Sequence, residues 1–161
     1  MDVLPREFAD PPYGSLEAAA CSPRVDDRQF RGIVIRLPER IRLRSDETLL
    51  LPICGYYQLA TQPLVQGAVM VVHVRGAGGT PFPPESGQVV VDHGENEPNV
   101  PDSAAEAPID PRLYAHSVSE SYFFLDGQRY LKGQLPAGNY EVVVSYGDAR
   151  SNLAQVAIAR D

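Results

Sequence analysis

The stretch that decides the fold is Leu135-Pro-Ala-Gly-Asn-Tyr-Glu-Val-Val-Val-Ser-Tyr146. Its first four residues are typical of a turn. From Asn139 onward, one set of alternate residues is apolar, which is the period of a strand whose two faces differ. A polar reversal follows at residues 147–152, and residues 153–159 have the character of a second strand. We therefore expect these residues to form the closing hairpin of a β-sandwich.

The first half of the chain predicts further strands of the same kind. Two alternating runs, at residues 32–37 and 41–45, place five apolar side chains inward: Ile33, Ile35, Leu37, Ile41 and Leu43. A third run, at residues 48–59, has Leu49, Leu51 and Ile53 on its core face, and Pro52 within it indicates a sheet edge or a bulge. The apolar run at residues 67–74 predicts a central strand covered on both sides.

Further strands are expected near residues 88–92 and 113–125, which gives about seven to nine strands in all. The length of 161 residues suits one domain with one core. Residues 1–30 contain four prolines and little periodicity, so we expect an N-terminal arm, extended or partly disordered. Residues 31–161 are expected to form the sandwich domain. The segment at residues 94–112 is rich in Pro, Ala, Asp and Glu, which predicts a long, exposed acidic loop.

The charge and hydropathy of the chain exclude several classes of partner. A net charge of −7 argues against binding to nucleic acid or to anionic lipid. No apolar run approaches the roughly 18 residues that would suggest a membrane span. The N-terminal stretch has no basic segment followed by a long apolar run, as a signal peptide has. This favours a cytoplasmic protein, and the alternative is an exported chain whose signal peptide is absent from the numbered sequence.

The two cysteines, Cys21 and Cys54, allow a single disulfide pairing. One possible pair is weak support for an oxidising compartment. We favour two reduced, partly buried thiols, and the sequence leaves open whether Cys21 reaches Cys54.

The late part of the chain resembles a known kind of sandwich. Tyr122-Phe-Phe-Leu-Asp126, Tyr130-Leu131 and the stretch from Leu135 to Val144 resemble the late strands of immunoglobulin-like and fibronectin-III-like domains. In those domains a tyrosine at the E–F corner donates its hydroxyl to nearby backbone. The resemblance covers residues 122–160 and implies that Tyr140 is this corner residue, with Val142 and Val144 facing the core.

The chain also departs from antibody domains, because it has no tryptophan and because Cys21 lies outside any convincing strand. A core centred on a disulfide and a tryptophan is therefore not expected. The resemblance predicts an all-β, antiparallel, immunoglobulin-like fold and carries no specific function.

Four possible metal ligands gather at the end of a predicted strand: Asp92, His93, Glu95 and Glu97. Carboxylate and imidazole groups suit a divalent cation. Their spacing matches neither the calcium loop of an EF-hand nor a zinc signature. We favour a solvated acidic loop, with a divalent-metal or carbohydrate-binding site near Asp92, His93 and Glu95 as the alternative.

The sequence contains no Gly-x-Ser-x-Gly nucleophile motif and no phosphate-binding loop. We therefore expect no enzymatic activity and no cofactor.

Several residues are candidates for contact with a partner. Phe82 lies among three prolines, and an aromatic on a stiffened loop is the kind of anchor that interfaces use. Tyr56 and Tyr57 are adjacent, so they point to opposite faces of a strand and we expect at least one to be exposed. Arg42 and Arg44 belong to a basic stripe with Arg36 and Arg40.

These observations favour a non-enzymatic module that binds another protein through loops at one end of the sandwich, as an adaptor, an assembly subunit or an inhibitor. A structural subunit of a larger assembly is a further alternative. Association of the chain with itself stays open.

Overall fold

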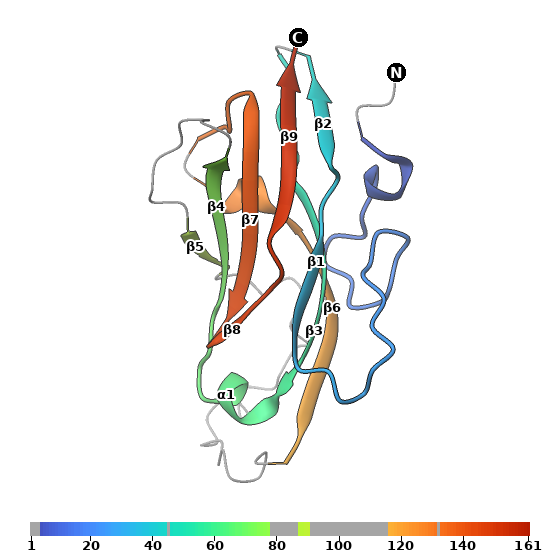
Figure 1. Cartoon of the computed structure of the whole chain (residues 1–161), viewed down its shortest axis with the longest axis vertical. Helices are drawn as coiled ribbons and strands as arrows, with labels where there is room; N and C mark the ends of the chain where they lie inside the picture. The colour runs from blue at the N-terminus through green and yellow to red at the C-terminus, as the bar shows by residue number, and fades with distance from the viewer. Residues whose placement is uncertain (1–3, 45, 78–86, 91–115, 132) are drawn as a thin grey trace, which may run out of the picture.

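The computed structural model describes residues 4–44, 46–77, 87–90, 116–131 and 133–161. Within these residues, two β-sheets pack together (Figure 1). A three-stranded sheet has the order β1 (Gly32–Arg36), β3 (Pro52–Ala60) and β6 (Val118–Asp126). A six-stranded sheet has the order β2 (Arg40–Leu43), β9 (Ala154–Arg160), β7 (Gly138–Tyr146), β4 (Met70–Ala77) and β5 (Gly87–Val90), and β8 (Ala149–Arg150) pairs with the end of β7. The helical segments are η1 (Arg6–Phe8), α1 (Thr61–Val65) and η3 (Gly127–Tyr130).

The predicted closing hairpin is confirmed, with a short strand added inside its reversal. Strands β7 and β9 pair antiparallel over residues 138–142 and 154–158. Between them, β8 folds back on β7 with Tyr146 opposite Ala149. Only Gly147 and Asp148 connect this pair, and Gly147 has a φ of 59°, the left-handed conformation that a tight turn requires and that glycine adopts without strain.

One pairing departs from the antiparallel expectation. The chain leaves the three-stranded sheet after β1 and enters the other sheet as β2, which runs parallel to β9. The side chain of Asn152 bridges the two sheets near this crossing. Its Oδ1 accepts the backbone N–H of Ile35 at 2.8 Å, and its Nδ2 donates to the carbonyl of the same residue at 3.2 Å. The backbone N–H and C=O of Ile35, at the free edge of β1, are therefore satisfied by a side chain from the connection between β8 and β9.

The core lies between the two sheets and contains the apolar residues that the alternation places inward. The predicted members on the first three runs are all buried: Ile33, Ile35, Leu37, Ile41, Leu43, Leu49, Leu51 and Ile53. Strands β4 and β7 of the six-stranded sheet contribute Val72, Val74, Val142 and Val144. Burial of these side chains supplies the main favourable free energy of folding.

Two predictions for single strands are wrong. Pro52 lies neither at a sheet edge nor in a bulge, since β3 is the middle strand of its sheet. Proline is tolerated there because it is the first residue of β3, where a missing N–H interrupts no ladder. Strand β4 is flanked by β7 and β5, but its outward residues Val71 and His73 are only half-buried. The outward face of β4 is therefore less buried than predicted.

The ring of Tyr140 is fully buried, and its hydroxyl donates to the backbone carbonyl of Pro136 at 2.6 Å. This is the hydrogen bond to nearby upstream backbone that the resemblance implies for Tyr140. Burial raises the pKa of Tyr140 still further above neutral pH, so the hydroxyl is protonated and able to donate. The bond fixes the turn at residues 135–138 against the start of β7.

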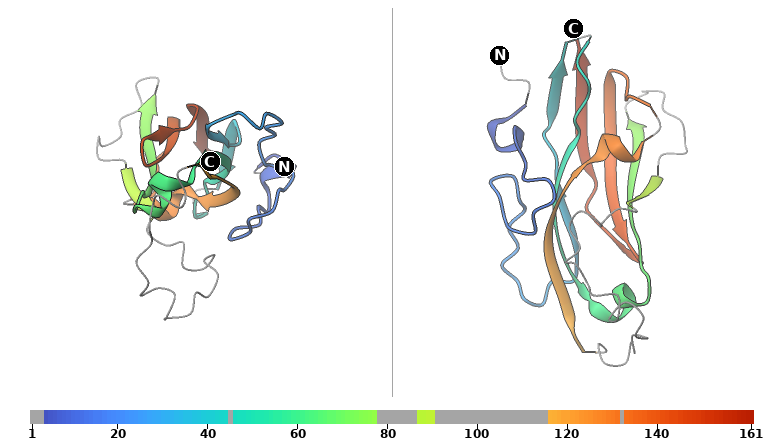
Figure 2. Two further views of the ribbon diagram at one scale, coloured as in Figure 1. Left: turned by 90° about the horizontal axis from the view of Figure 1, so that it is seen from below. Right: turned by 180° about the vertical axis from the view of Figure 1, so that it is seen from behind.

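The N-terminal arm, residues 4–31, lies against the three-stranded sheet on the side away from the six-stranded sheet (Figure 2). Phe8 of η1 is 2% exposed and packs with Phe124 of β6 in a second apolar cluster, separate from the main core. The arm is therefore a third layer over part of the sandwich.

Candidate interaction surfaces

The outer face of the three-stranded sheet consists of alternate residues of its strands, which lie side by side in register. Val34, Tyr56 and Tyr122 form one row, and Arg36, Cys54 and Phe124 form the next. The rings of Tyr56 and Tyr122 are 4.9 Å apart between centroids. This aromatic face is covered by the arm, which explains why β3 is buried on both faces along most of its length.

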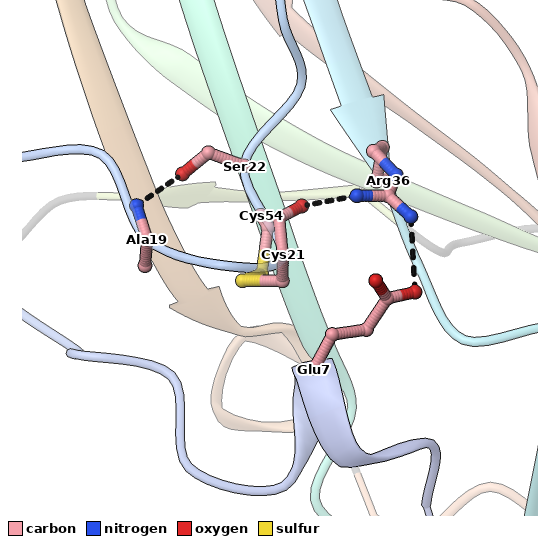
Figure 3. The surroundings of a disulfide bond; sticks show 6 residues. All are labelled: Glu7, Ala19, Cys21, Ser22, Arg36 and Cys54. Carbon is pink, nitrogen blue, oxygen red and sulfur yellow. Dashed lines mark hydrogen bonds and ion pairs between the residues drawn. A yellow bond between two sulfur atoms is a disulfide. The ribbon is translucent and has the colours of Figure 1, made fainter.

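A disulfide bond joins Cys21 of the arm to Cys54 of β3, and both cysteines are fully buried (Figure 3). The expectation of two reduced thiols is therefore wrong. The bond lies on the outer face of the sheet, so no disulfide occupies the centre of the sandwich. The cross-link joins residues 33 apart and lowers the conformational entropy of the unfolded chain. In the chain-entropy account this stabilises the folded state by about 4 kcal/mol.

Arg36 holds the arm beside this disulfide (Figure 3). Its Nη1 donates to the carbonyl of Cys21 at 3.2 Å, and its Nη2 donates to Oε1 of Glu7 at 3.0 Å. The guanidinium carbon also lies 5.5 Å from the centroid of the Phe8 ring, within the range of a cation–π contact. Arg36 therefore contacts three points of the arm and is separated from the rest of the predicted basic stripe.

Gln58 provides a second attachment for the arm. Its Nε2 donates to the carbonyl of Arg28 at 2.7 Å. The hydroxyl of Tyr56 donates toward Oε1 of Gln58 at 2.8 Å and Oε2 of Glu120 at 3.0 Å. Burial, reinforced by Glu120, raises the pKa of Tyr56 to about 12. Tyr56 is accordingly a neutral donor that orients Gln58 toward the arm.

Neither tyrosine of the adjacent pair is exposed, so that expectation is wrong. Tyr56 is 7% exposed beneath the arm. Tyr57 points between the sheets, where its ring meets that of Tyr146 edge-on at 5.4 Å between centroids. Both rings therefore stabilise the folded chain, and their role in binding a partner stays a prediction.

The outer face of the six-stranded sheet differs, because side chains on it are half-buried or exposed. Val71 and His73 of β4 and Val143 and Ser145 of β7 are half-buried. Leu153, which directly precedes β9, is 45% exposed. Nε2 of His73 and the hydroxyl oxygen of Ser145 are 2.9 Å apart, and Arg75 forms an ion pair with Glu141 farther along the same strands. This face combines apolar side chains with paired polar groups.

The environment of His73 predicts a pH dependence. Desolvation, with a smaller effect of the positive charge of Arg150, lowers the pKa of His73. The unfolded chain therefore takes up a proton near pH 6.5 that the folded chain resists, and stability falls as the pH falls through and below that value. We expect the free energy of unfolding, measured with urea between pH 7.5 and 5.5, to fall less in His73→Gln than in the unsubstituted chain. An equal fall in the free energy of unfolding for the two proteins would contradict the lowered pKa of His73.

The remaining arginines of the stripe form an edge of the six-stranded sheet. Arg40, Arg42 and Arg44 are exposed, while Ile41 and Leu43 between them face the core. Strand β2 is the first in its sheet order and pairs with β9. The stripe thus places charges along an edge strand, which discourages unspecific strand pairing.

A groove of about 1080 Å³ lies where β1 leaves its sheet. Phe8 and Glu7 of the arm and Leu37 line one part of it, and Leu153 and Val156 line another. The arm therefore contributes to the shape of this groove as well as covering the aromatic face.

The other predicted site residues lie outside the described residues: Phe82, Asp92, His93, Glu95 and Glu97. In the ranges that the structure describes, no group of three or more His, Cys, Asp or Glu side chains is placed to hold a metal ion. The sequence reasoning missed Asn152, Gln58 and Phe8 as residues that attach one segment to another. Phe8 offered a signal, since it is a large apolar residue among the prolines and charges of the arm.

Comparison of the chain with models of known protein families found no match, and searches of curated proteins and of solved structures found no similar protein. The helices in the described ranges are all too short or too polar to span a membrane.

Proposed function

We propose that this chain is a non-enzymatic protein-binding module with an immunoglobulin-like strand arrangement. In immunoglobulin sandwiches, strands A, B and E share one sheet, and strands G, F and C share the other with C′ beside C. The orders β1-β3-β6 and β9-β7-β4-β5 agree with this division. The buried Tyr140 in β7, the counterpart of strand F, supports the same assignment.

The observation that carries the proposal is the unequal covering of the two sheets. The arm packs on the outer face of the three-stranded sheet, whereas Val71, Val143 and Leu153 remain half-buried or exposed on the other. Apolar side chains on an uncovered sheet face can serve as the centre of an interface. The exposed arginines of β2 lie on a strand of the same sheet. We infer a partner with an apolar centre and acidic side chains at its rim.

We also propose that the chain works in an oxidising compartment, as an exported protein would. Disulfides persist in such compartments and are rare where cytosolic thiols are kept reduced. The support is the buried bond between Cys21 and Cys54. If cells are treated with a thiol-alkylating reagent as soon as they are harvested, both cysteines should be recovered unmodified, because a cysteine in a disulfide has no thiol to alkylate. Complete alkylation of both would contradict this part of the proposal.

Substitutions on the uncovered face test the binding role. Val143→Asp combined with Leu153→Asp places two carboxylates at the centre of the proposed contact, so a partner identified by cross-linking should bind at least about tenfold more weakly. Leu16→Asp is the matched control, because Leu16 is 57% exposed on the arm, away from this face. Affinities are compared by surface-immobilised binding after circular dichroism has shown that each variant is folded. Equal affinities for the two variants would overturn the proposed contact.

A further inference from the structure

The arm and the sandwich have separate apolar clusters on opposite faces of the three-stranded sheet. The main core lies between the sheets. The second cluster consists of Phe8, Cys21, Cys54 and Phe124 on the outer face. Of the arm, Leu4 packs against the main core. Apart from this contact by Leu4, the main core comes from residues outside the arm, so the two clusters are largely separate.

The non-covalent contacts that attach the arm are individually weak. The side chains of Arg36 and Glu7 are 40% and 41% exposed, so their ion pair is screened by water and salt. Gln58 contacts the arm through its Nε2, which donates to the backbone carbonyls of Arg28 at 2.7 Å and Asp27 at 3.4 Å. Phe8 is the main apolar anchor. Many arm residues between these points are exposed, including Arg24 and Arg28. The covalent bond between Cys21 and Cys54 is consequently the strongest restraint on the arm.

We propose that this disulfide is a redox-sensitive latch. When it is reduced, residues 4–31 leave the outer face of the three-stranded sheet while the sandwich stays folded. The aromatic face that includes Tyr56, Tyr122 and Phe124 is then uncovered, and the groove beside Leu37 loses the part that the arm supplies. The chain thus has two surface states, one where disulfides persist and another where thiols are kept reduced.

The reductant is a dithiol, and the reaction balances as a two-electron exchange. One thiolate of the dithiol attacks a sulfur of the bond, forms a mixed disulfide and displaces the other cysteine as a thiolate, which takes up a proton. The second thiol of the reagent then attacks the mixed disulfide. Both cysteines end as thiols and the dithiol ends as a disulfide. Because both cysteines are fully buried, the first attack requires a transient opening of the arm.

The test compares the oxidised full-length chain with the same protein after complete reduction by dithiothreitol. We expect trypsin to cleave after Arg24 and Arg28 at least about tenfold faster in the reduced protein, while the fragment that contains the sandwich persists. In parallel, hydrogen exchange should accelerate across residues 4–31 and stay slow in β7 and β9, which pair at the centre of the six-stranded sheet.

The double variant Cys21→Ser with Cys54→Ser should match the reduced protein whether or not dithiothreitol is present. If this variant does not fold, the reduced protein made from folded, oxidised chain supplies the same measurement. The proposal is overturned if the arm of the reduced protein stays as resistant to trypsin as in the oxidised protein. It is equally overturned if β7 and β9 lose their protection on reduction, because the disulfide then supports the whole sandwich.

Discussion

Replacing Gly55 with alanine is expected to lower the free energy of unfolding by about 3 kcal/mol, the upper end of the usual cost of overpacking. Gly55 lies in the middle of β3, directly opposite Phe123 of β6. A Cβ at position 55 would lie 2.0 Å from Cζ of Phe123 and 2.4 Å from Cε2. The Phe123 ring occupies the space that a side chain would need, so the ring must leave the core face or the two strands must separate.

Gly127→Ala is a matched control for this substitution. A Cβ at position 127 would lie 2.9 Å from Cδ1 of Ile53 and 3.0 Å from Cδ2 of Leu51, which are the flexible ends of aliphatic side chains. We expect a loss well below that of Gly55→Ala. Combining Gly55→Ala with Phe123→Leu should recover part of the lost stability. Urea unfolding measures all three, and equal losses for the two single variants would contradict the account.

Tyr140→Phe is expected to cost about 2 kcal/mol in the free energy of unfolding. The substitution removes the hydroxyl that donates to the carbonyl of Pro136 and keeps the ring that fills the core. The loss includes the hydrogen bond and a carbonyl left without that donor beside a buried ring. Because the turn at residues 135–138 leads into β7, hydrogen exchange at the start of β7 should accelerate as well.

Tyr13→Phe provides the comparison for Tyr140→Phe, because the Tyr13 side chain is 42% exposed on the arm. Its stability should change by less than about 0.5 kcal/mol, as is usual for surface substitutions. Thermal unfolding followed by circular dichroism compares the two. A Tyr140→Phe variant as stable as Tyr13→Phe would show that the hydroxyl does not hold the turn.

The sequence predicts the sandwich because alternation reports directly which side chains face inward. Ile33, Ile35 and Leu43 are in the core for this reason. The parallel pairing of β2 with β9 could not be obtained in this way, since residues 40–43 and 157–160 carry no signal for each other in their own periodicity. Alternation indicates which face of a strand is buried, but it does not indicate which strands lie beside it in the sheet.

The covered outer face was harder to predict than the core. Tyr56 and Gln58 have the mixed character of an outward face, and their burial comes from a segment more than twenty residues earlier in the chain. The pairing of Cys21 with Cys54 depends on the approach of that segment, which spacing does not encode. The outer face of β4 and β7 likewise depends on which strands lie side by side, which the periodicity of one strand does not encode.

The position of β9 has a consequence for how the protein is made. Residues 154–160 form an inner strand, between β7 on one side and β2 on the other. Strand β2 therefore gains its neighbour in the sheet only after residue 160 has been synthesised, more than a hundred residues after β2 itself. Pairings so distant in sequence form slowly, because a long loop must close first. We expect the nascent chain to remain incompletely folded until synthesis passes this point, a state in which it can be bound by chaperones or threaded through a translocation pore.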